Sequence, residues 1–343
     1  MSQTLTPDHL LETRGVRQDF GAFVVAAAFD RGGVPAFALG DGTLRLLRDG
    51  QWHSVPAHDG GVLALAADAR AEGFVSGGDD GSLVRTARDG TAMQIAGFGM
   101  KWVEHVASFA DAKSSVVACA VGKHLHLFDG AGEKLKTLTH PSSVSGVVFD
   151  ARGKRIAASH YNGASLWFVA SRTDNPRVLE WKGSHLAIAI SPDGDSVVTA
   201  MQENALHGWR LSDGQHMRMS GYPSKTEALS FTRSGRWLAT SGAEAIVLWP
   251  FTGGGPMGKA PTELAGADGV ICTQVACHPQ HEAVAAGFSD GMVVLADIPG
   301  ARILPVAGPG RGPISALAWS IDGGRLAFGG ESGFAAVVDL AKA

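Results

Sequence analysis

The stretch HPSSVSGVVFDARGKRIAASHYNGASLW, residues 140–167, contains most of one structural unit of this chain. An apolar run ends at Phe149, a polar turn follows, and a run of small and apolar residues leads to Ser159. A second turn closes on Gly163, and a third run ends at Trp167. Alternating apolar and polar residues, broken by Asp, Gly and Pro turns, predict antiparallel β-strands joined by tight turns.

The same order of strands and turns repeats along the chain. Each unit continues with a more polar fourth strand, as at residues 133–138. A regular period of this length is typical of repeat architectures, so the sequence predicts eight consecutive units of four antiparallel strands. The first strands of the units end at spacings of 38, 42, 40, 41, 41, 46 and 42 residues, at Phe29, Ala67, Phe109, Phe149, Ile190, Phe231, Cys277 and Trp319.

This repeat resembles the WD-repeat family of β-propellers over nearly the whole chain, from about residue 13 to residue 340. The best local matches are residues 140–167, 191–194 and 76–81, although no unit ends in the Trp-Asp pair itself. The resemblance implies an all-β fold: a closed β-propeller of four-stranded antiparallel blades. The direct count is eight blades, and seven is the alternative.

In that family a turn histidine, a Ser or Thr on the second strand, a turn aspartate and a third-strand Trp form a stabilising network. The resemblance implies that the network is incomplete in this chain, because each of two units departs from it at one position. Unit four has His140, Ser159, Asn162 and Trp167, and unit two has His58, Ser76, Asp80 and Arg85.

The two ends of the chain complement each other. Residues 334–340 would be the third strand of the last unit, and no fourth strand follows them. Residues 13–20 precede the first unit, so the resemblance implies that this N-terminal strand closes the ring and covers an open sheet edge. We expect one WD-repeat propeller domain over residues 1–343, with residues 1–12 as a flexible tail.

Composition excludes several classes of protein. Hydrophobic residues make up 45% and charged residues 18%, which favours a globular chain over a disordered one. The formal net charge of −4 argues against nucleic-acid or membrane partners. An odd number of cysteines, three, shows no disulfide framework, and no signal peptide or membrane-spanning run is visible. We therefore expect a soluble, cytoplasmic monomer without a cofactor.

Two classes of loop share one face of a WD-repeat propeller: those from a fourth strand to the next first strand, and those between second and third strands. Both tyrosines of the chain fall in such loops, and tyrosine and tryptophan are frequent at binding hot spots. Four cations on this face could attract an acidic partner or an anionic molecule, or they could be solvated and paired with nearby acids. The predicted partner-binding residues are Lys101, Trp102, Tyr161, Lys182, His185, Glu203, Tyr222, Lys225 and Arg311.

Metal and catalytic sites are weaker hypotheses. His124 and His126 lie on one face of a strand, and Cys277, His278 and His281 cluster, but neither group has the spacing of a zinc site. No phosphate-binding glycine loop or nucleophile elbow is present. We expect no enzyme and no bound metal.

The sequence therefore predicts a non-catalytic scaffold that presents one propeller face to a protein or peptide partner, an inference that rests on analogy of fold. The alternative is a small anionic ligand or a metal in the central channel, bound by the cations or by His160 and His185.

Overall fold

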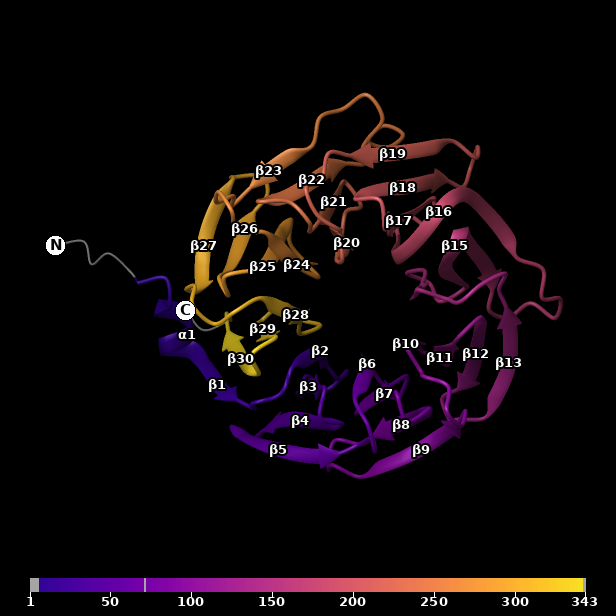
Figure 1. The fold of residues 1–343 in the computed structure, drawn as a ribbon, viewed down its shortest axis with the longest axis horizontal. Helices are drawn as coiled ribbons and strands as arrows, with labels where there is room; N and C mark the ends of the chain where they lie inside the picture. The colour runs from indigo at the N-terminus through magenta and orange to yellow at the C-terminus, as the bar shows by residue number, and fades with distance from the viewer. Residues whose placement is uncertain (1–5, 71, 342–343) are drawn as a thin grey trace.

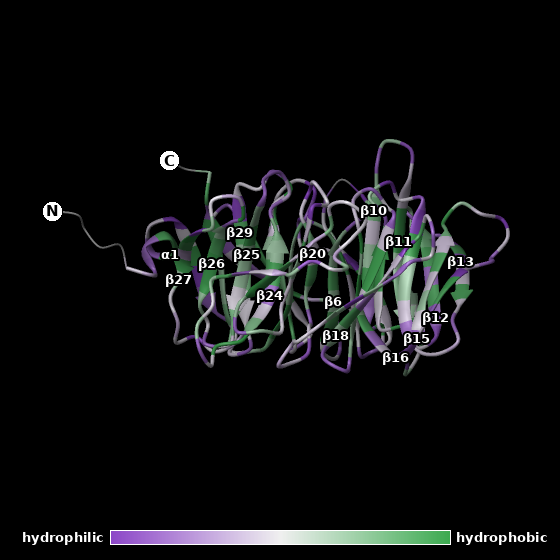
Figure 2. Cartoon of the chain, turned by 90° about the horizontal axis from the view of Figure 1, so that it is seen from above, coloured by the Kyte–Doolittle hydropathy of each residue, from purple (hydrophilic) through white to green (hydrophobic). Residues whose placement is uncertain are grey.

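The computed structural model describes residues 6–70 and 72–341, and in this part of the chain every sheet is antiparallel. The sheets are arranged in a ring, with the first strand of each four-stranded sheet nearest the centre and the fourth outermost (Figure 1). Seen edge-on, the molecule is a flattened disc whose loops emerge on two opposite faces (Figure 2). The fold is thus a β-propeller, as the repeat predicts.

The first half of the ring contains one short helix and three four-stranded sheets after the N-terminal strand. The described elements are α1 His9–Arg14, β1 Gly15–Asp19, β2 Val24–Phe29, β3 Pro35–Leu39, β4 Thr43–Arg48, β5 Gln51–Pro56, β6 Val62–Ala67, β7 Phe74–Gly78, β8 Ser82–Thr86, β9 Ala92–Gly97, β10 His105–Ala110, β11 Ser115–Val121, β12 His124–Asp129 and β13 Lys134–Thr139.

The second half contains one six-stranded sheet and three four-stranded sheets, the last of which includes β1. Its strands are β14 Gly146–Phe149, β15 Arg155–Phe168, β16 Arg177–Ile190, β17 Ser196–Met201, β18 Ala205–Arg210, β19 His216–Ser220, β20 Leu229–Phe231, β21 Trp237–Thr240, β22 Ile246–Pro250, β23 Thr262–Leu264, β24 Cys272–Cys277, β25 Ala283–Phe288, β26 Val293–Asp297, β27 Arg302–Ala307, β28 Ile314–Trp319, β29 Arg325–Gly330 and β30 Phe334–Asp339.

The predicted ends of the first strands are confirmed in seven of the eight units. The exception is unit three, where β10 continues one residue past Phe109 to Ala110. This agreement follows from the residues that come next: turns with Asp, Ser or Gly interrupt the apolar run in seven units, and His278-Pro279 begins the turn in unit seven. In unit one, for example, the Asp30 carboxylate accepts a hydrogen bond from the backbone N–H of Val34 at 2.7 Å and fixes the turn.

The described strands form seven separate sheets. The prediction of eight blades is therefore wrong, and the alternative of seven is the count that the sheets support. Units four and five share the six-stranded sheet β14-β15-β16-β17-β18-β19. The reason is β16, whose residues 177–184 pair with β15 and whose residues 185–190 pair with β17. No turn separates these two halves, because the Tyr161 and Ser184 backbones pair across the connection.

Within this sheet β15 folds back on itself. The N–H of Val169 donates to the carbonyl of Lys154 at 2.9 Å, and His160 Nε2 lies 2.9 Å from Ser165 Oγ. Residues on the two sides of Asn162 therefore lie next to each other. Asn162 has a positive φ of 67° and Gly163 one of 140°, backbone conformations that asparagine and glycine adopt more readily than other residues.

The apolar core lies between neighbouring sheets. One cluster combines Phe37 and Leu39 of β3 with Ala327 of β29 and Ala335 of β30, all fully buried. Another joins Leu44 of β4 to Phe74 of β7. Small residues on second strands let adjacent sheets pack closely, which explains their abundance in this chain.

Pairing of the chain ends closes the ring. β1 pairs antiparallel with β30, from Gly15 opposite Val338 to Asp19 opposite Phe334. The prediction of an N-terminal closing strand is therefore confirmed, and β1 lies beside the C-terminal end of the chain in Figure 1.

The prediction that residues 1–12 form a flexible tail is wrong for residues 9–12, because they belong to α1. Residues 1–5 lie outside the described part of the chain. Leu10 and Leu11 of α1 are buried, and α1 contacts β27 and β30. The Asp8 carboxylate accepts hydrogen bonds from the N–H of Gly308 at 2.6 Å and from Arg311 Nη2 at 2.7 Å. The Arg311 pair holds the pKa of Asp8 below its usual value. The sequence before β1 thus anchors the closing strand.

We predict that Leu11→Ala destabilises the protein. Leu11 is 1% exposed, so truncation removes buried apolar surface and leaves a cavity, at a cost of about 2–4 kcal/mol in the free energy of unfolding. Chemical denaturation would measure it, with Val16→Ala on the exposed side of β1 as the control. Equal effects of the two substitutions would contradict a structural role for α1.

Candidate functional site

The two loop classes that the sequence predicts to share a face do contact each other. We call this face the upper face. The Gly81 turn is one example: a Cβ on Gly81 would lie 1.9 Å from the carbonyl oxygen of Gly99, so only glycine fits. The upper face consists of loops 20–23, 57–61, 98–104, 140–145, 181–184, 221–228, 265–271 and 308–313, and of turns 40–42, 79–81, 122–123, 161–162, 202–204, 241–245, 289–291 and 331–333.

Tyr222 does not contribute to an exposed surface, contrary to the prediction. Its side chain is 8% exposed, and its hydroxyl lies 2.6 Å from Thr240 Oγ1. The indole Nε1 of Trp249 donates to the same hydroxyl at 2.6 Å. Burial raises the pKa of Tyr222 to about 12, so the phenol stays protonated. Tyr222 therefore joins the second and third strands of unit six through a buried polar link.

His185 is also buried rather than available to a partner. Its Nδ1 lies 2.7 Å from Thr199 Oγ1 and its Nε2 2.9 Å from the carbonyl oxygen of Trp181. His160, the other histidine of the alternative channel site, has its Nδ1 2.9 Å from the carbonyl oxygen of Tyr161. Both nitrogens of each ring are thus used within the protein. This removes the ligands on which the metal alternative depended.

Arg311 is half-buried and committed to the chain ends. Besides its contact with Asp8, it donates to the carbonyl of Gly308 at 2.7 Å and lies over the Phe334 ring at 5.1 Å. Arg311 therefore helps to close the ring and, contrary to the prediction, is not part of an exposed binding surface.

The family's polar network is present in unit two. His58 Nε2 lies 2.8 Å from Ser76 Oγ, and its Nδ1 lies 3.1 Å from Asp80 Oδ1. Arg85 at the tryptophan position instead forms a buried ion pair with Asp68 at 2.6 Å. At this position on β8 an ion pair with Asp68, which follows β6, therefore replaces the contact of the missing aromatic ring.

Unit four has a looser network. His140 Nε2 accepts a hydrogen bond from Trp167 Nε1 at 3.1 Å, but the Ser159 hydroxyl donates to the carbonyl of Leu186. His140 Nδ1 is buried without a hydrogen-bond partner. Asn162 accepts from the N–H of Gly183 at 3.2 Å, so the turn binds the next loop rather than the histidine.

Four of the predicted residues lie together on an exposed arc of the upper face: Lys101, Trp102, Tyr161 and Lys182. Trp102 is 56% exposed and Tyr161 58%, high values for aromatic side chains. Met100, which sequence reasoning did not select, is 97% exposed and directly precedes Lys101 in the chain. Glu203 and Lys225 are exposed farther along the same face.

Backbone contacts connect this arc. Glu104 N–H donates to the carbonyl of Ala120, which leads to the turn at Lys123, and His140 N–H donates to the Lys123 carbonyl at 2.9 Å. Tyr161 N–H donates to Ser142 Oγ at 2.9 Å. Together with the Asn162–Gly183 bond, these contacts link each loop of the arc to the next. We call Met100, Lys101, Trp102, Lys123, Tyr161 and Lys182 the Lys–aromatic patch.

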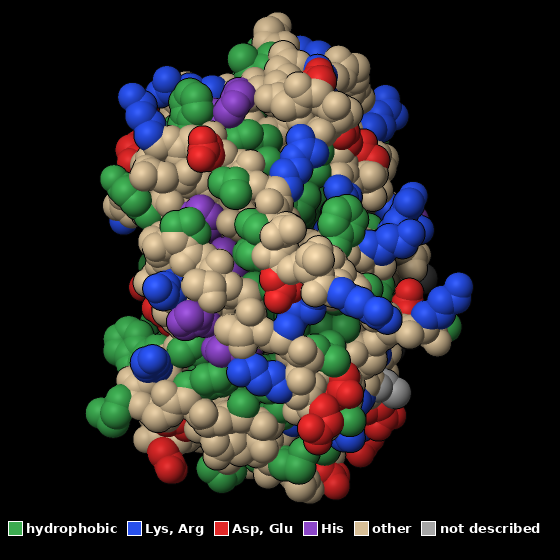
Figure 3. Space-filling model, turned by 90° about the vertical axis from the view of Figure 1, so that its right-hand side faces the viewer, with side chains coloured by type: hydrophobic (Ala, Val, Ile, Leu, Met, Phe, Trp, Pro, Cys, Tyr) green, Lys and Arg blue, Asp and Glu red, His purple; other side chains and the backbone are tan. Residues whose placement is uncertain are grey.

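The lysines of the patch are unpaired. None of the ammonium groups of Lys101, Lys123 and Lys182 forms an ion pair or side-chain hydrogen bond with a described residue. This argues against the interpretation that they merely neutralise acidic turns. Figure 3 views the outer rim of the ring on the side of β13 and β16, where Lys and Arg side chains are interspersed with exposed hydrophobic ones.

The remaining upper face carries mostly acidic side chains, so the patch is a cationic region with acidic surroundings. Lys225 is an exposed cation outside the patch. A local positive potential within an acidic surface favours binding of an anionic segment at that place. The exposed carboxylates of the surroundings are Asp41, Asp59, Glu203, Glu227, Glu244, Asp268 and Glu331.

No group of three or more His, Cys, Asp or Glu residues that could hold a metal ion occurs in the described part of the chain. His278, which the sequence places beside Cys277, accepts from the N–H groups of Gln280 and His281 at 3.0 Å through Nδ1. Among the described residues, no helix is long and apolar enough to cross a membrane.

Comparison with known proteins agrees with the fold and the resemblance. No family model matches the chain. Autophagy-related protein 16 of Arabidopsis thaliana is 24% identical over 316 residues, which are 86% of this chain and 61% of that protein. WD repeat-containing protein slp1 of Schizosaccharomyces pombe is 28% identical over 116 residues, 32% of this chain and 24% of that protein. The chain thus spans about three fifths of the first relative and a quarter of the second.

Among solved structures, the crystal structure of the computationally designed Ika8 protein is similar, with a TM-score of 0.73 and 18% identity. The match covers 94% of this chain and 98% of that chain. At this identity the similarity concerns the fold alone. The β-propeller fold and the sequence relatives, at 24% and 28% identity, are consistent with the resemblance to WD-repeat proteins.

We predict that Tyr222→Phe destabilises the protein without changing the Lys–aromatic patch. The substitution leaves the buried Thr240 hydroxyl and Trp249 indole N–H without their shared partner, which costs about 1–3 kcal/mol. Thermal and chemical denaturation would measure the loss, with Tyr161→Phe as the exposed control. An unchanged free energy of unfolding for Tyr222→Phe would contradict the structural role.

The buried histidines predict a pH dependence of stability. Burial lowers the pKa of His126 and His140 to about 4 and that of His207 to about 3, from a usual value of 6.5. Below pH 6.5 the unfolded chain takes up protons that the folded protein excludes, so stability is full above that pH and falls toward pH 4. Urea denaturation across this range would measure the decline, and a constant midpoint would contradict it.

Proposed function

We propose that this protein is a non-catalytic scaffold whose Lys–aromatic patch binds an acidic segment of a partner protein that also carries an apolar or aromatic side chain. The observation that carries the proposal is the coincidence of unpaired lysines with exposed Met100, Trp102 and Tyr161 in one connected arc. WD-repeat relatives support the general role of a protein-interaction scaffold.

The chemistry of the patch defines the partner. Lysine ammonium groups that lack an internal partner are free to pair with carboxylates, and their contribution weakens with salt. Trp and Tyr supply large contact area with few rotatable bonds and retain a polar group. Met100 adds a flexible apolar contact that adapts to different side chains. An acidic peptide interrupted by one large apolar residue fits all three features.

The predicted residues outside the patch take a secondary part in this proposal. Glu203 and Lys225 lie beyond Lys182 along the upper face and would meet the flank of a longer partner segment. Glu203 lies close to the patch, since a Cβ on Gly183 would be 3.1 Å from its Oε1. Glu203 would repel acidic residues there and so limit the direction in which the segment lies.

We also propose that the chain acts as a monomeric single domain in the cytoplasm. The cysteines of the described residues, Cys119, Cys272 and Cys277, are all free. Burial raises the pKa of each thiol to about 12, so these groups are poor nucleophiles. Free thiols are usual in a reducing compartment.

A peptide-display selection tests the proposed function. We expect the wild-type protein to enrich peptides that combine Asp or Glu with an aromatic or large aliphatic residue. Trp102→Ala together with Tyr161→Ala should weaken binding of an enriched peptide about tenfold or more, because hot-spot aromatic residues each contribute more than about 1 kcal/mol. Fluorescence anisotropy with the labelled peptide would measure the affinity.

Matched control variants distinguish a specific effect of the patch lysines from a general effect of net charge on binding. Charge reversal of Lys101, Lys123 and Lys182 to Glu should abolish binding. The same reversal at Lys113, Lys134 and Lys154, which are exposed outside the upper face, should have little effect. Selection of no acidic peptides, or equal losses in both triple variants, would refute the proposal.

A further inference from the structure

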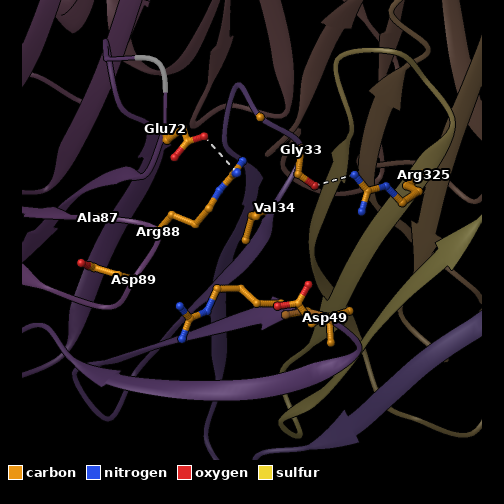
Figure 4. Close-up of a pocket in the computed structure, with 11 residues that line it drawn as sticks. Gly33, Val34, Asp49, Glu72, Ala87, Arg88, Asp89 and Arg325 are labelled. Atoms are coloured by element: carbon orange, nitrogen blue, oxygen red, sulfur yellow. Dashed lines mark hydrogen bonds and ion pairs between the residues drawn. The ribbon is translucent and has the colours of Figure 1, made fainter.

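A cavity of about 670 Å³ opens on the face opposite the Lys–aromatic patch. It lies between units one, two and eight, and is lined by turns that join first to second strands and third to fourth strands. The volume is that of a small-molecule site. Its lining residues are drawn in Figure 4, and the charged ones are Arg48, Asp49, Glu72, Arg88, Asp89 and Arg325.

Arg88 forms one wall and is held by two carboxylates. Its Nε lies 3.3 Å from Asp30 Oδ2, and Asp30 is 1% exposed at the end of β2. Its Nη1 lies 3.0 Å from Glu72 Oε1, and Figure 4 shows this contact across the upper part of the cavity. Glu72 is exposed, so a ligand can compete with it for Arg88, whereas the buried Asp30 keeps the guanidinium in place.

Arg325 approaches from unit eight. Its Nη2 donates to the carbonyl of Gly33 at 2.5 Å, and its guanidinium lies over the Phe29 ring at 5.4 Å. Figure 4 shows Arg325 and Arg88 on opposite sides of the Gly33–Val34 segment. A Cβ on Gly33 would lie 2.7 Å from Arg325 Nη2, so the absence of a side chain lets this arginine reach the cavity.

Arg48 is the arginine that lacks a close partner. Its Nε is buried without a hydrogen-bond acceptor, and no carboxylate of a described residue lies within 4 Å of its guanidinium. The terminal Nη1 and Nη2 groups of Arg48 form no hydrogen bond with a described residue, so they can donate to a ligand oxygen. Sequence reasoning selected none of these three arginines, because each comes from a different strand or turn.

Three carboxylates, those of Asp49, Glu72 and Asp89, line the cavity beside the three arginines. The pKa of Asp89 is lowered chiefly because the Thr91 N–H donates a hydrogen bond to its carboxylate. The positive charge of Arg48 lowers this pKa by a smaller amount. In Figure 4 the Asp89 carboxylate points away from Arg88 and Glu72. The Asp89 carboxylate is therefore not paired with Arg88, and the cavity offers guanidinium groups to a ligand beside these carboxylates.

We propose that this cavity is a binding site for a small molecule that carries a phosphate or carboxylate group, with Arg48 as its principal donor. Guanidinium binds both groups through two parallel N–H donors. Arg88 and Arg325, each fixed by contacts within the protein, supply further positive charge on the cavity walls. The site is independent of the Lys–aromatic patch, which occupies the other face of the ring.

Isothermal titration calorimetry of the full chain with pyrophosphate, inorganic phosphate and citrate tests this site. We expect saturable binding at about millimolar concentration or below, and the order of the three affinities distinguishes phosphate from carboxylate recognition. Arg48→Ala should weaken the best probe about tenfold or more. Arg172→Ala removes the same charge from an exposed loop elsewhere and should leave the affinity unchanged.

Two further variants keep the test decisive if Arg48→Ala folds poorly. Glu72→Gln releases Arg88 from its exposed partner and should strengthen binding severalfold. Reversal of the three patch lysines should leave anion binding intact, so a failure here is distinct from a failure of the scaffold proposal. Absence of binding by the wild type, or equal affinity of Arg48→Ala and Arg172→Ala, would overturn the inference.

Discussion

The pairing of β1 with β30 is the interaction on which the rest of the molecule depends. Each sheet packs its faces against two neighbours, so an open ring would leave one apolar face uncovered. The hydrogen bonds from Gly15 to Asp19 complete the last sheet, and the buried leucines of α1 hold the strand there. Both proposed binding surfaces require this closure, because each is assembled from turns of several units.

Buried polar links at equivalent positions hold the upper face together. Unit two uses imidazole, hydroxyl and carboxylate, whereas unit six uses a phenol, a hydroxyl and an indole. The chemistry differs, yet each link ties the loop before a first strand to the second strand behind it. Such links keep the loops rigid, so that residues at their tips can be exposed without losing their position.

The sequence predicted the repeat and the strand ends because turn residues interrupt the apolar runs at a nearly constant period. It did not distinguish Tyr222 from Tyr161, since both fall in loops of one face. Spacing contained the missing signal: Tyr222 precedes Thr240 by 18 residues and Trp249 by 27, as His58 precedes Ser76 and His140 precedes Trp167. The exposure of Met100 is a property of the folded chain, and so is the pairing of β16 with both β15 and β17. No local sequence pattern determines either one.

Closure by β1 also bears on how the chain is made. The ribosome synthesises β1 before the 29 strands that follow it here, so β1 has an unpaired edge until β30 has also emerged. Contacts between the two ends of a chain form slowly, and an open strand edge is prone to pair with other chains in the meantime. Arg17 and Asp19 place charge on β1 and Asp8 and Glu12 place charge just before it, which reduces unwanted association of the nascent chain.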